Sequence, residues 1–206
     1  MSFQKISKIA AAKNAKLVVV AKNREIAEIQ KIVDAGAKFL AFNRVAEAAE
    51  KFPKIKNFRG KKVLIGHLQK NKIKKAIEIF DEIHSVDSEI LARKIAEKSP
   101  RKMPILFQIN VDRDENKFGF LPEDFEKSAK NLAKIENLKI RGVMTIGKKK
   151  KNPRETFENL KKIFDKTKKI FGDDFTEISM GMSGDFEIAL ECGATQIRVG
   201  SAIFKN

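Results

Sequence analysis

A lysine that closes an apolar, strand-like run is the most informative feature of the chain. Residues 17–20 read Leu-Val-Val-Val, and four consecutive large apolar residues predict a strand that is buried on both faces. Lys22 stands at the carboxyl end of this strand, where α/β proteins place their chemistry. Partial burial there would favour the uncharged amine, which can attack a carbonyl carbon. Asn23 is expected to cap the helix that follows, and Asp87 is expected to cap the helix after the fourth predicted strand.

The spacing of apolar residues predicts a repeated strand and helix pattern along the whole chain. Phe3, Ile6, Ile9 and Ala10 have the spacing of an amphipathic helix ahead of the first strand. Strand-like segments then alternate with helical ones, which indicates a parallel sheet with helices outside it. The predicted strands are 17–22, 38–42, 62–66, 82–86, 104–111, 140–146, 176–180 and 195–199. We therefore expect residues 1–206 to form a single α/β domain, a closed (β/α)8 TIM barrel, with an open doubly wound sheet as the alternative.

Two segments that contain glycine and serine follow the last two predicted strands and have the composition of an anion site. Gly181-Met182-Ser183-Gly184 follows the seventh strand, and Gly200-Ser201 follows the eighth. Glycine lets the backbone approach a ligand, hydroxyls and free amides bind phosphate, and barrels often place phosphate after these two strands. Because the eighth strand of a barrel closes onto the first, this site and Lys22 would be neighbours. An aldehyde that carries a phosphate fits both features, and pyridoxal phosphate (PLP) is the common one.

Composition narrows the classes of function. The 206 residues carry a net charge of +16, with 34% charged and 42% hydrophobic residues, which is typical of a soluble globular protein. The lysines are spread over the predicted helices apart from the run 148–151, and no Trp or Tyr can stack on bases, so a basic nucleic-acid-binding barrel is the weaker alternative. No apolar stretch is long enough to predict a membrane helix. The single cysteine, Cys192, excludes an internal disulfide and fits a cytoplasmic location.

Several short motifs, in a fixed order, together resemble one family. On these motifs the chain resembles the pyridoxal phosphate homeostasis proteins, which are similar to the N-terminal barrel domain of alanine racemase. The matching stretches are Val20-Ala21-Lys22, Leu64-Ile65-Gly66-His67-Leu68-Gln69-Lys70-Asn71-Lys72, Ile83-His84-Ser85-Val86-Asp87-Ser88, Gln108-Ile109-Asn110, Lys117-Phe118-Gly119-Phe120, Arg141-Gly142-Val143-Met144-Thr145-Ile146, Ser179-Met180-Gly181-Met182-Ser183 and Arg198-Val199-Gly200-Ser201-Ala202-Ile203-Phe204.

The resemblance implies a PLP site and a role for each residue around it. The implied residues are Lys22 as the aldimine-forming anchor, Ser183, Gly200 and Ser201 on the phosphate, Arg198 at the pyridine nitrogen, Asn43 beside the cofactor, and Met144 and His84 on the pocket wall. One departure lies next to this set. Ala41-Phe42 stands where the family usually has Gly-Glu, so the hydrogen bonding near Asn43 is expected to differ.

The same resemblance separates a carrier from an enzyme. Racemases of this fold use a tyrosine from a second domain as one of two bases, and this chain has no tyrosine, which excludes that mechanism. A cationic Arg198 would also keep the pyridine nitrogen unprotonated and weaken the cofactor as an electron sink. The implied function is a monomeric, non-enzymatic protein that buffers PLP and delivers it to PLP-dependent apoenzymes. The alternative is a PLP-dependent enzyme acting on an amino acid, with His84, Lys117 or Asp87 as its base.

Overall fold

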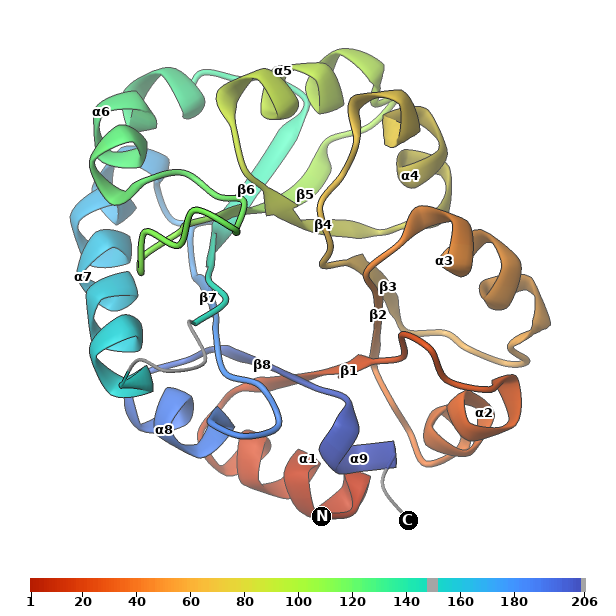
Figure 1. Cartoon of the computed structure of the whole chain (residues 1–206). Coiled ribbons are helices and arrows are strands. Elements are labelled where there is room, and N and C mark those ends of the chain that lie inside the picture. Colours follow the sequence, from red (N-terminus) through yellow and green to blue (C-terminus); the bar gives the residue numbers. More distant parts are fainter. Residues whose placement is uncertain (148–151, 205–206) are drawn as a thin grey trace.

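The eight strands form one closed parallel barrel. In the computed structural model, which describes residues 1–147 and 152–204, each strand pairs with the next and β8 pairs with β1, where Val18 lies opposite Arg198. Figure 1 shows the ring of strands with the helices outside it. The strands are β1 (Lys16–Val20), β2 (Phe39–Phe42), β3 (Lys61–Leu64), β4 (Glu82–Val86), β5 (Met103–Gln108), β6 (Leu138–Met144), β7 (Glu177–Ser179) and β8 (Gln196–Val199). The predicted barrel is confirmed, and the open sheet is excluded.

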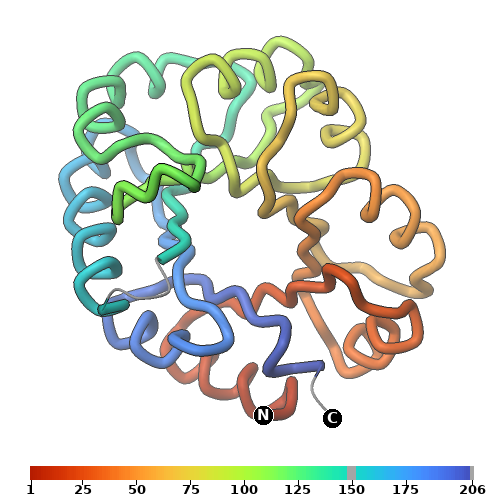
Figure 2. Tube along the Cα trace, viewed as in Figure 1, coloured from red at the N-terminus to blue at the C-terminus, as the bar shows by residue number. Residues whose placement is uncertain are grey.

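A helix follows each strand, and one more precedes the barrel. Figure 2 traces this alternation from the first helix to the last, and it shows the first and last segments of the chain side by side. The α-helices are α1 (Phe3–Ala12), α2 (Ile26–Asp34), α3 (Val45–Lys51), α4 (Ile73–Ile79), α5 (Glu89–Lys98), α6 (Pro122–Leu132), α7 (Pro153–Phe171), α8 (Phe186–Glu191) and α9 (Ser201–Phe204), with short 3-10 turns η1 (Phe52–Lys54) and η2 (Lys70–Lys72). No helix in the described part of the chain is long and apolar enough to cross a membrane.

Two expected helix caps differ from the structure. Asn23 does not cap α2, because its backbone takes the left-handed conformation at a φ of 55°. The helix begins instead with a capping box in which Glu25 and Glu28 each accept from the other's backbone N–H. Ser88, rather than Asp87, caps α5, and its hydroxyl accepts from the N–H of Leu91 at 3.3 Å.

The inside of the barrel is apolar on one side and polar on the other. Val18, Ala41, Val63 and Ile65, contributed by β1, β2, β3 and the residue after β3, form a small buried apolar cluster. The facing strands contribute the buried polar residues His84, Glu177, Ser179, Gln196 and Arg198. Since a packed barrel interior usually holds branched apolar side chains, this polar half requires internal partners.

The amino ends of the strands supply those partners as a network of charges. The Glu177 carboxylate accepts from Lys16 Nζ at 2.6 Å and from Arg141 Nη2 at 3.2 Å. Glu82 Oε2 lies 3.0 Å from Nε2 of the buried His84. Burial by itself would raise the pKa of the Glu82 carboxyl, but the hydrogen bond and charge of His84, with the charges of two lysines, outweigh burial and lower it.

Replacing Glu82 is expected to change how stability depends on pH. The folded-state pKa of Glu82 lies below its ordinary value of 4.5, so the carboxylate stabilises the fold above that pH. This contribution is lost as pH falls through the lowered value. Glu82→Gln should lose about 1–3 kcal/mol at pH 7 and should then show a shallower loss of stability in acid than the unchanged protein. Urea unfolding from pH 7 to pH 3 measures both effects. The exposed Glu78→Gln serves as the control, and parallel pH profiles for all three proteins would contradict the prediction.

Candidate functional site

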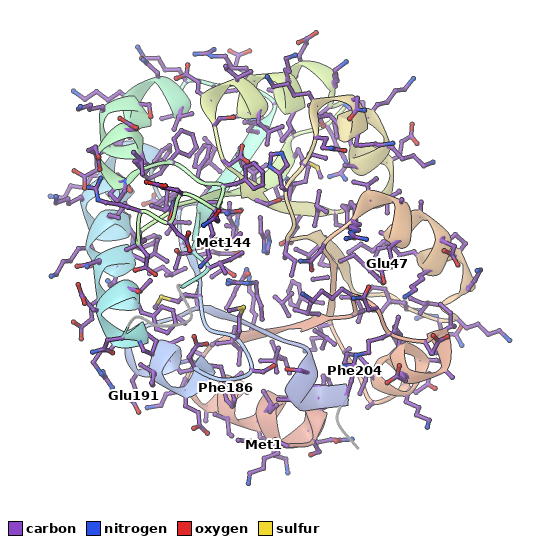
Figure 3. The ribbon with its side chains drawn as sticks, in the orientation of Figure 1. Met1, Glu47, Met144, Phe186, Glu191 and Phe204 are labelled. Carbon is purple, nitrogen blue, oxygen red and sulfur yellow. The ribbon has the colours of Figure 1, made fainter. Side chains whose placement is uncertain are left out.

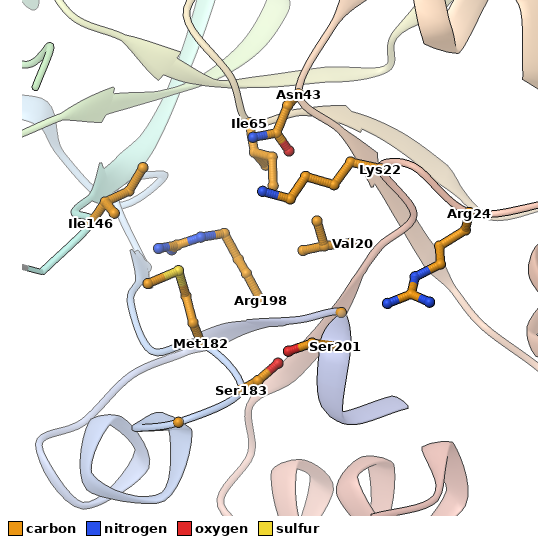
Figure 4. Close-up of a pocket in the computed structure, with 12 residues that line it drawn as sticks. Val20, Lys22, Arg24, Asn43, Ile65, Ile146, Met182, Ser183, Arg198 and Ser201 are labelled. Atoms are coloured by element: carbon orange, nitrogen blue, oxygen red, sulfur yellow. The ribbon is translucent and has the colours of Figure 1, made fainter. Parts of the chain in front are cut away.

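One cavity opens at the carboxyl ends of the barrel strands and holds most of the residues singled out from the sequence. Its volume is about 430 Å³, and the residues that line it come from the ends of β1, β2, β3, β6, β7 and β8 (Figure 4). The lining residues are Val20, Lys22, Arg24, Asn43, Ile65, Ile146, Met182, Ser183, Gly184, Arg198, Gly200 and Ser201. Lys22 and the predicted phosphate segments are therefore neighbours, as expected from closure of β8 onto β1.

Lys22 lies two residues beyond β1, in the loop that leads to α2. Figure 4 shows its amine extending into the cavity toward Asn43. The side chain is exposed, so the expectation of partial burial is wrong; the strand ends at Val20 and the lysine follows it into the open mouth. The backbone behind it is fixed, because the N–H of Asn23 donates to Glu47 Oε1 at 2.7 Å. A primary amine thus faces the cavity from an anchored loop.

Arg198 forms the inner wall of the cavity. Its side chain lies inside the barrel and is only 3% exposed. Its guanidinium donates to Ser179 Oγ at 2.8 Å and to the carbonyl oxygen of Thr145 at 2.7 Å. Burial lowers the pKa of Arg198 to about 10, partly offset by the charge of Asp185, so the group remains a cation at neutral pH. Both acceptors are neutral, which leaves its charge to act on the cavity.

The segments after β7 and β8 meet at the end of the cavity opposite Asn43 (Figure 4). Ser183 Oγ accepts from the N–H of Ala202 at 3.2 Å, which ties the first segment to α9 and leaves the hydroxyl hydrogen free to donate to a ligand. A Cβ at Gly200 would lie 2.8 Å from the Val20 carbonyl oxygen, so a side chain does not fit there. Gly184 has open space where its Cβ would be. Hydroxyls and backbone without side chains therefore line this end.

Asn43 presents a polar atom without a partner beside Lys22. Its Oδ1 is buried and makes no hydrogen bond within the described structure, as expected of a group that a ligand satisfies. The neighbouring Phe42 does not reach the cavity. Its ring is fully buried and packs edge-on against Phe52 at a centroid distance of 5.0 Å. The replacement of the usual glutamate by Phe42 thus affects the layer between barrel and helices.

The charges around the cavity select the kind of ligand. Lys22, Arg24 and Arg198 line it, whereas no carboxylate does among the residues that the structure describes. A cavity lined by cations and hydroxyls favours an anion. The exposed amine of Lys22 adds the ability to bond a carbonyl carbon, while hydroxyls and the open glycine backbone at the other end suit a phosphate. These residues fit a phosphorylated aldehyde such as PLP.

Met144 and His84 do not line this cavity, contrary to expectation. Met144 is fully buried at the end of β6, and Arg198 reaches across from β8 to the adjacent carbonyl of Thr145. Figure 3 labels Met144 on the far side of the barrel from α9. His84 lies deeper in the barrel, where Glu82 holds one ring nitrogen and the other, Nδ1, has no hydrogen bond within the described residues. The alternation of residues along a strand predicts that the side chains of Met144 and His84 point inward, but it does not predict how deep in the barrel they lie.

The side chains considered as bases for an enzyme also lie outside the cavity lining. Asp87 Oδ2 lies 2.8 Å from His67 Nδ1. Lys117 Nζ donates to the carbonyl oxygens of Ile146 and Gly147 at 3.2 and 2.7 Å. Each group is therefore engaged elsewhere, as is His84 with Glu82.

Arg24 is the charged lining residue that the sequence did not single out as functional. It follows Lys22 by two positions, and in a lysine-rich chain its charge alone does not distinguish it from solvated neighbours. Only the reversal of the chain at Asn23 brings it to the cavity rim. The basic run 148–151 lies outside the described residues.

Comparison with known proteins identifies the family. The family model described as "Alanine racemase, N-terminal domain" matches residues 2–206. A relative from Synechocystis sp., named "Pyridoxal phosphate homeostasis protein", is 38% identical over 196 residues, which cover 92% of this chain and 90% of the relative. The chain belongs to the pyridoxal phosphate homeostasis protein family. The resemblance read from the motifs is thereby confirmed.

Solved structures of another family member match the barrel over nearly its whole length. The PipY protein of Synechococcus elongatus without PLP is similar at a TM-score of 0.91 and 31% identity. The same protein with PLP bound is similar at a TM-score of 0.87 and 30% identity. Each match covers 98% of this chain and 99% of the other. The family member described here thus shares its complete barrel with a relative whose structure contains PLP.

Proposed function

We propose that this protein binds PLP in the cavity at the barrel mouth, buffers it, and delivers it to PLP-dependent apoenzymes. The observation that carries the proposal is that one cavity brings together the Lys22 amine, serine hydroxyls and open glycine backbone. Among the described residues, its lining includes three cationic side chains and no carboxylate. Family membership and the PLP-bound PipY structure support the same ligand.

Lys22 holds the cofactor by a reversible bond in this proposal. Its uncharged amine attacks the aldehyde carbon, a C=N bond forms, and the carbonyl oxygen leaves as water. Addition of water reverses the reaction, and an incoming primary amine can replace Lys22, which then departs as the free amine. Because Lys22 is exposed at the cavity mouth, either reagent can reach it. Reversible attachment at an open site suits storage and transfer.

The remaining residues orient the cofactor. Ser183, Gly200 and Ser201, which line the cavity, would hold the phosphate, and the unpartnered Asn43 Oδ1 would accept from the ring substituents. Arg198 would face the pyridine nitrogen. A fixed cation there disfavours protonation of that nitrogen, which weakens the electron sink that carbanion chemistry requires. The same arrangement that retains the cofactor therefore suppresses turnover of amino acids.

Removing the phosphate-facing hydroxyls is expected to weaken retention without preventing attachment. Ser201→Ala and Ser183→Ala should each raise the dissociation constant for PLP about tenfold, the effect of one lost hydrogen bond to a charged group. Ser183→Ala should also loosen α9, because Ser183 Oγ accepts from Ala202 N–H. Equilibrium dialysis measures the constants, with Ser128→Ala on α6 as the control. Unchanged retention in both variants would place the phosphate elsewhere.

Two assays separate a carrier from an enzyme. The loaded protein should restore activity to an apoenzyme that requires PLP, at a rate that increases when a free amine is added. The same loaded protein, incubated with amino acids in deuterated water, should not exchange the hydrogen on the α-carbon. Exchange that requires Lys22 would contradict the proposal and establish a PLP-dependent enzyme.

A further inference from the structure

Arg24 occupies a position on the cavity rim that the roles above leave unused. It lies in the loop between β1 and α2 and lines the cavity. The left-handed backbone of Asn23 turns the chain between Lys22 and Arg24, so that both side chains contribute to one cavity. Figure 4 shows the Arg24 guanidinium on the side of α9 and Ser201, away from the Lys22 amine.

The backbone that presents Arg24 is held by a partly buried ion pair from α3. Lys51 Nζ donates to the carbonyl oxygen of Arg24 at 2.7 Å and to Glu47 Oε1, also at 2.7 Å. Glu47 Oε1 in turn accepts from the N–H of Asn23. The side chains of Lys51 and Glu47 are only 16% and 15% exposed. This clamp fixes the loop before any ligand arrives, so little backbone ordering remains for binding to impose.

The guanidinium itself is positioned but weakly engaged. It lies over the Phe204 ring of α9 at 5.1 Å from the centroid. Its one hydrogen bond within the described part of the chain joins Nη1 to Glu28 Oε1 at 3.4 Å. Arg113, by contrast, makes two bonds of 2.7 and 2.8 Å to Glu123. Arg24 therefore retains most of its five N–H donors for a further acceptor.

We propose that Arg24 binds the phosphoryl oxygens of the ligand and makes the site select phosphorylated aldehydes over unphosphorylated ones. This inference rests on the proposed function. A phosphate monoester carries close to two negative charges at neutral pH. In the proposed function Lys22 is committed to the aldehyde and Arg198 to the pyridine nitrogen, which leaves Arg24 as the lining cation that has free donors and no assigned role. Its planar fork can take two oxygens at once, which a serine hydroxyl cannot.

The test compares binding of PLP with binding of pyridoxal, which lacks the phosphate. Arg24→Gln should raise the dissociation constant for PLP about tenfold and leave that for pyridoxal within about twofold. Arg24→Met keeps an unbranched side chain against Phe204 but has no hydrogen-bond donors, and it should behave like Arg24→Gln. Arg24→Lys keeps the charge and should lose less affinity for PLP. Arg44→Gln, which removes an exposed charge outside the cavity, should match the unchanged protein. Circular dichroism and the melting temperature verify that each variant folds.

Two results would overturn the proposal. Equal affinity of all variants for PLP would show that Arg24 makes no contact, and an equal loss for PLP and pyridoxal would show that it acts only by packing on Phe204.

A second probe separates this proposal from the proposed function. Titration with inorganic phosphate, followed by ³¹P NMR, should show binding that Arg24→Gln weakens and Arg44→Gln does not. If no PLP attaches to Lys22 but phosphate still binds in this way, the result supports the anion site at Arg24 and contradicts the proposed PLP function. If PLP attaches to Lys22 and Arg24→Gln binds both phosphate and PLP normally, the result supports the PLP function and contradicts the role of Arg24.

Discussion

Lys22→Ala is expected to leave the barrel folded and to abolish covalent attachment of PLP. The side chain is exposed and lies beyond the end of β1, so its loss removes no core packing. No other lysine lines the cavity within the described part of the chain. Borohydride converts an imine into a stable amine, and mass spectrometry of the reduced protein should show one added cofactor in the unchanged protein and none in the variant.

The control for Lys22 is an exposed lysine outside the cavity. Lys70→Ala removes the same charge from the 3-10 turn η2, and it should retain the full adduct. Retained binding of PLP without an adduct in Lys22→Ala would agree with the account, because the phosphate site remains. An undiminished adduct in Lys22→Ala would show that another amine is the anchor.

Gly66→Ala is expected to damage both the fold and the site. A Cβ at this position would lie 2.1 Å from the carbonyl oxygen of Asn43, and 2.7 and 2.8 Å from its carbonyl carbon and Cα. These are backbone atoms, so no side-chain rotation relieves the overlap. The variant should lose about 1–3 kcal/mol of stability, or more, and displace Asn43. Urea unfolding and PLP titration measure the two effects.

Gly147→Ala provides a matched control for this substitution. Its Cβ would meet only Thr156 Cγ2, at an ordinary contact distance of 3.9 Å. Gly147 also lies near the cavity mouth, next to the lining residue Ile146, so the comparison isolates the steric overlap. Equal stability of the two variants would mean that the strand ends at Asn43 and Gly66 can separate at little cost.

The fold could be predicted because each strand carries its own signal. Val18 and Val19, in the middle of the predicted apolar run, are fully buried, and the eight predicted strands all appear in the barrel. The predicted ends of helices and strands are less accurate than the predicted elements themselves, because these ends depend on contacts with residues elsewhere in the chain. Asn23 illustrates this: Glu47, from a different helix, accepts its N–H, and the helix begins later at a local pair of glutamates. Helix propensity alone does not predict that contact.

The site could be predicted only in part, for a related reason. Strand ends place Lys22, Ser183 and Gly200 at one mouth of the barrel, and the structure brings them together. The depth of a side chain in the barrel depends on the stagger of the strands, which separates His84 from the cavity. Arg24 was missed because its place depends on a local chain reversal and on Phe204 at the far end of the sequence (Figure 3).

Reduction of the PLP complex followed by peptide mapping tests the central claim most directly. The protein is titrated with PLP, its visible absorbance is recorded, and borohydride is added before digestion. The account predicts a yellow complex with one equivalent of cofactor, bleached by borohydride, and a single modified peptide that contains Lys22. A colourless protein, or modification scattered over surface lysines, would contradict it.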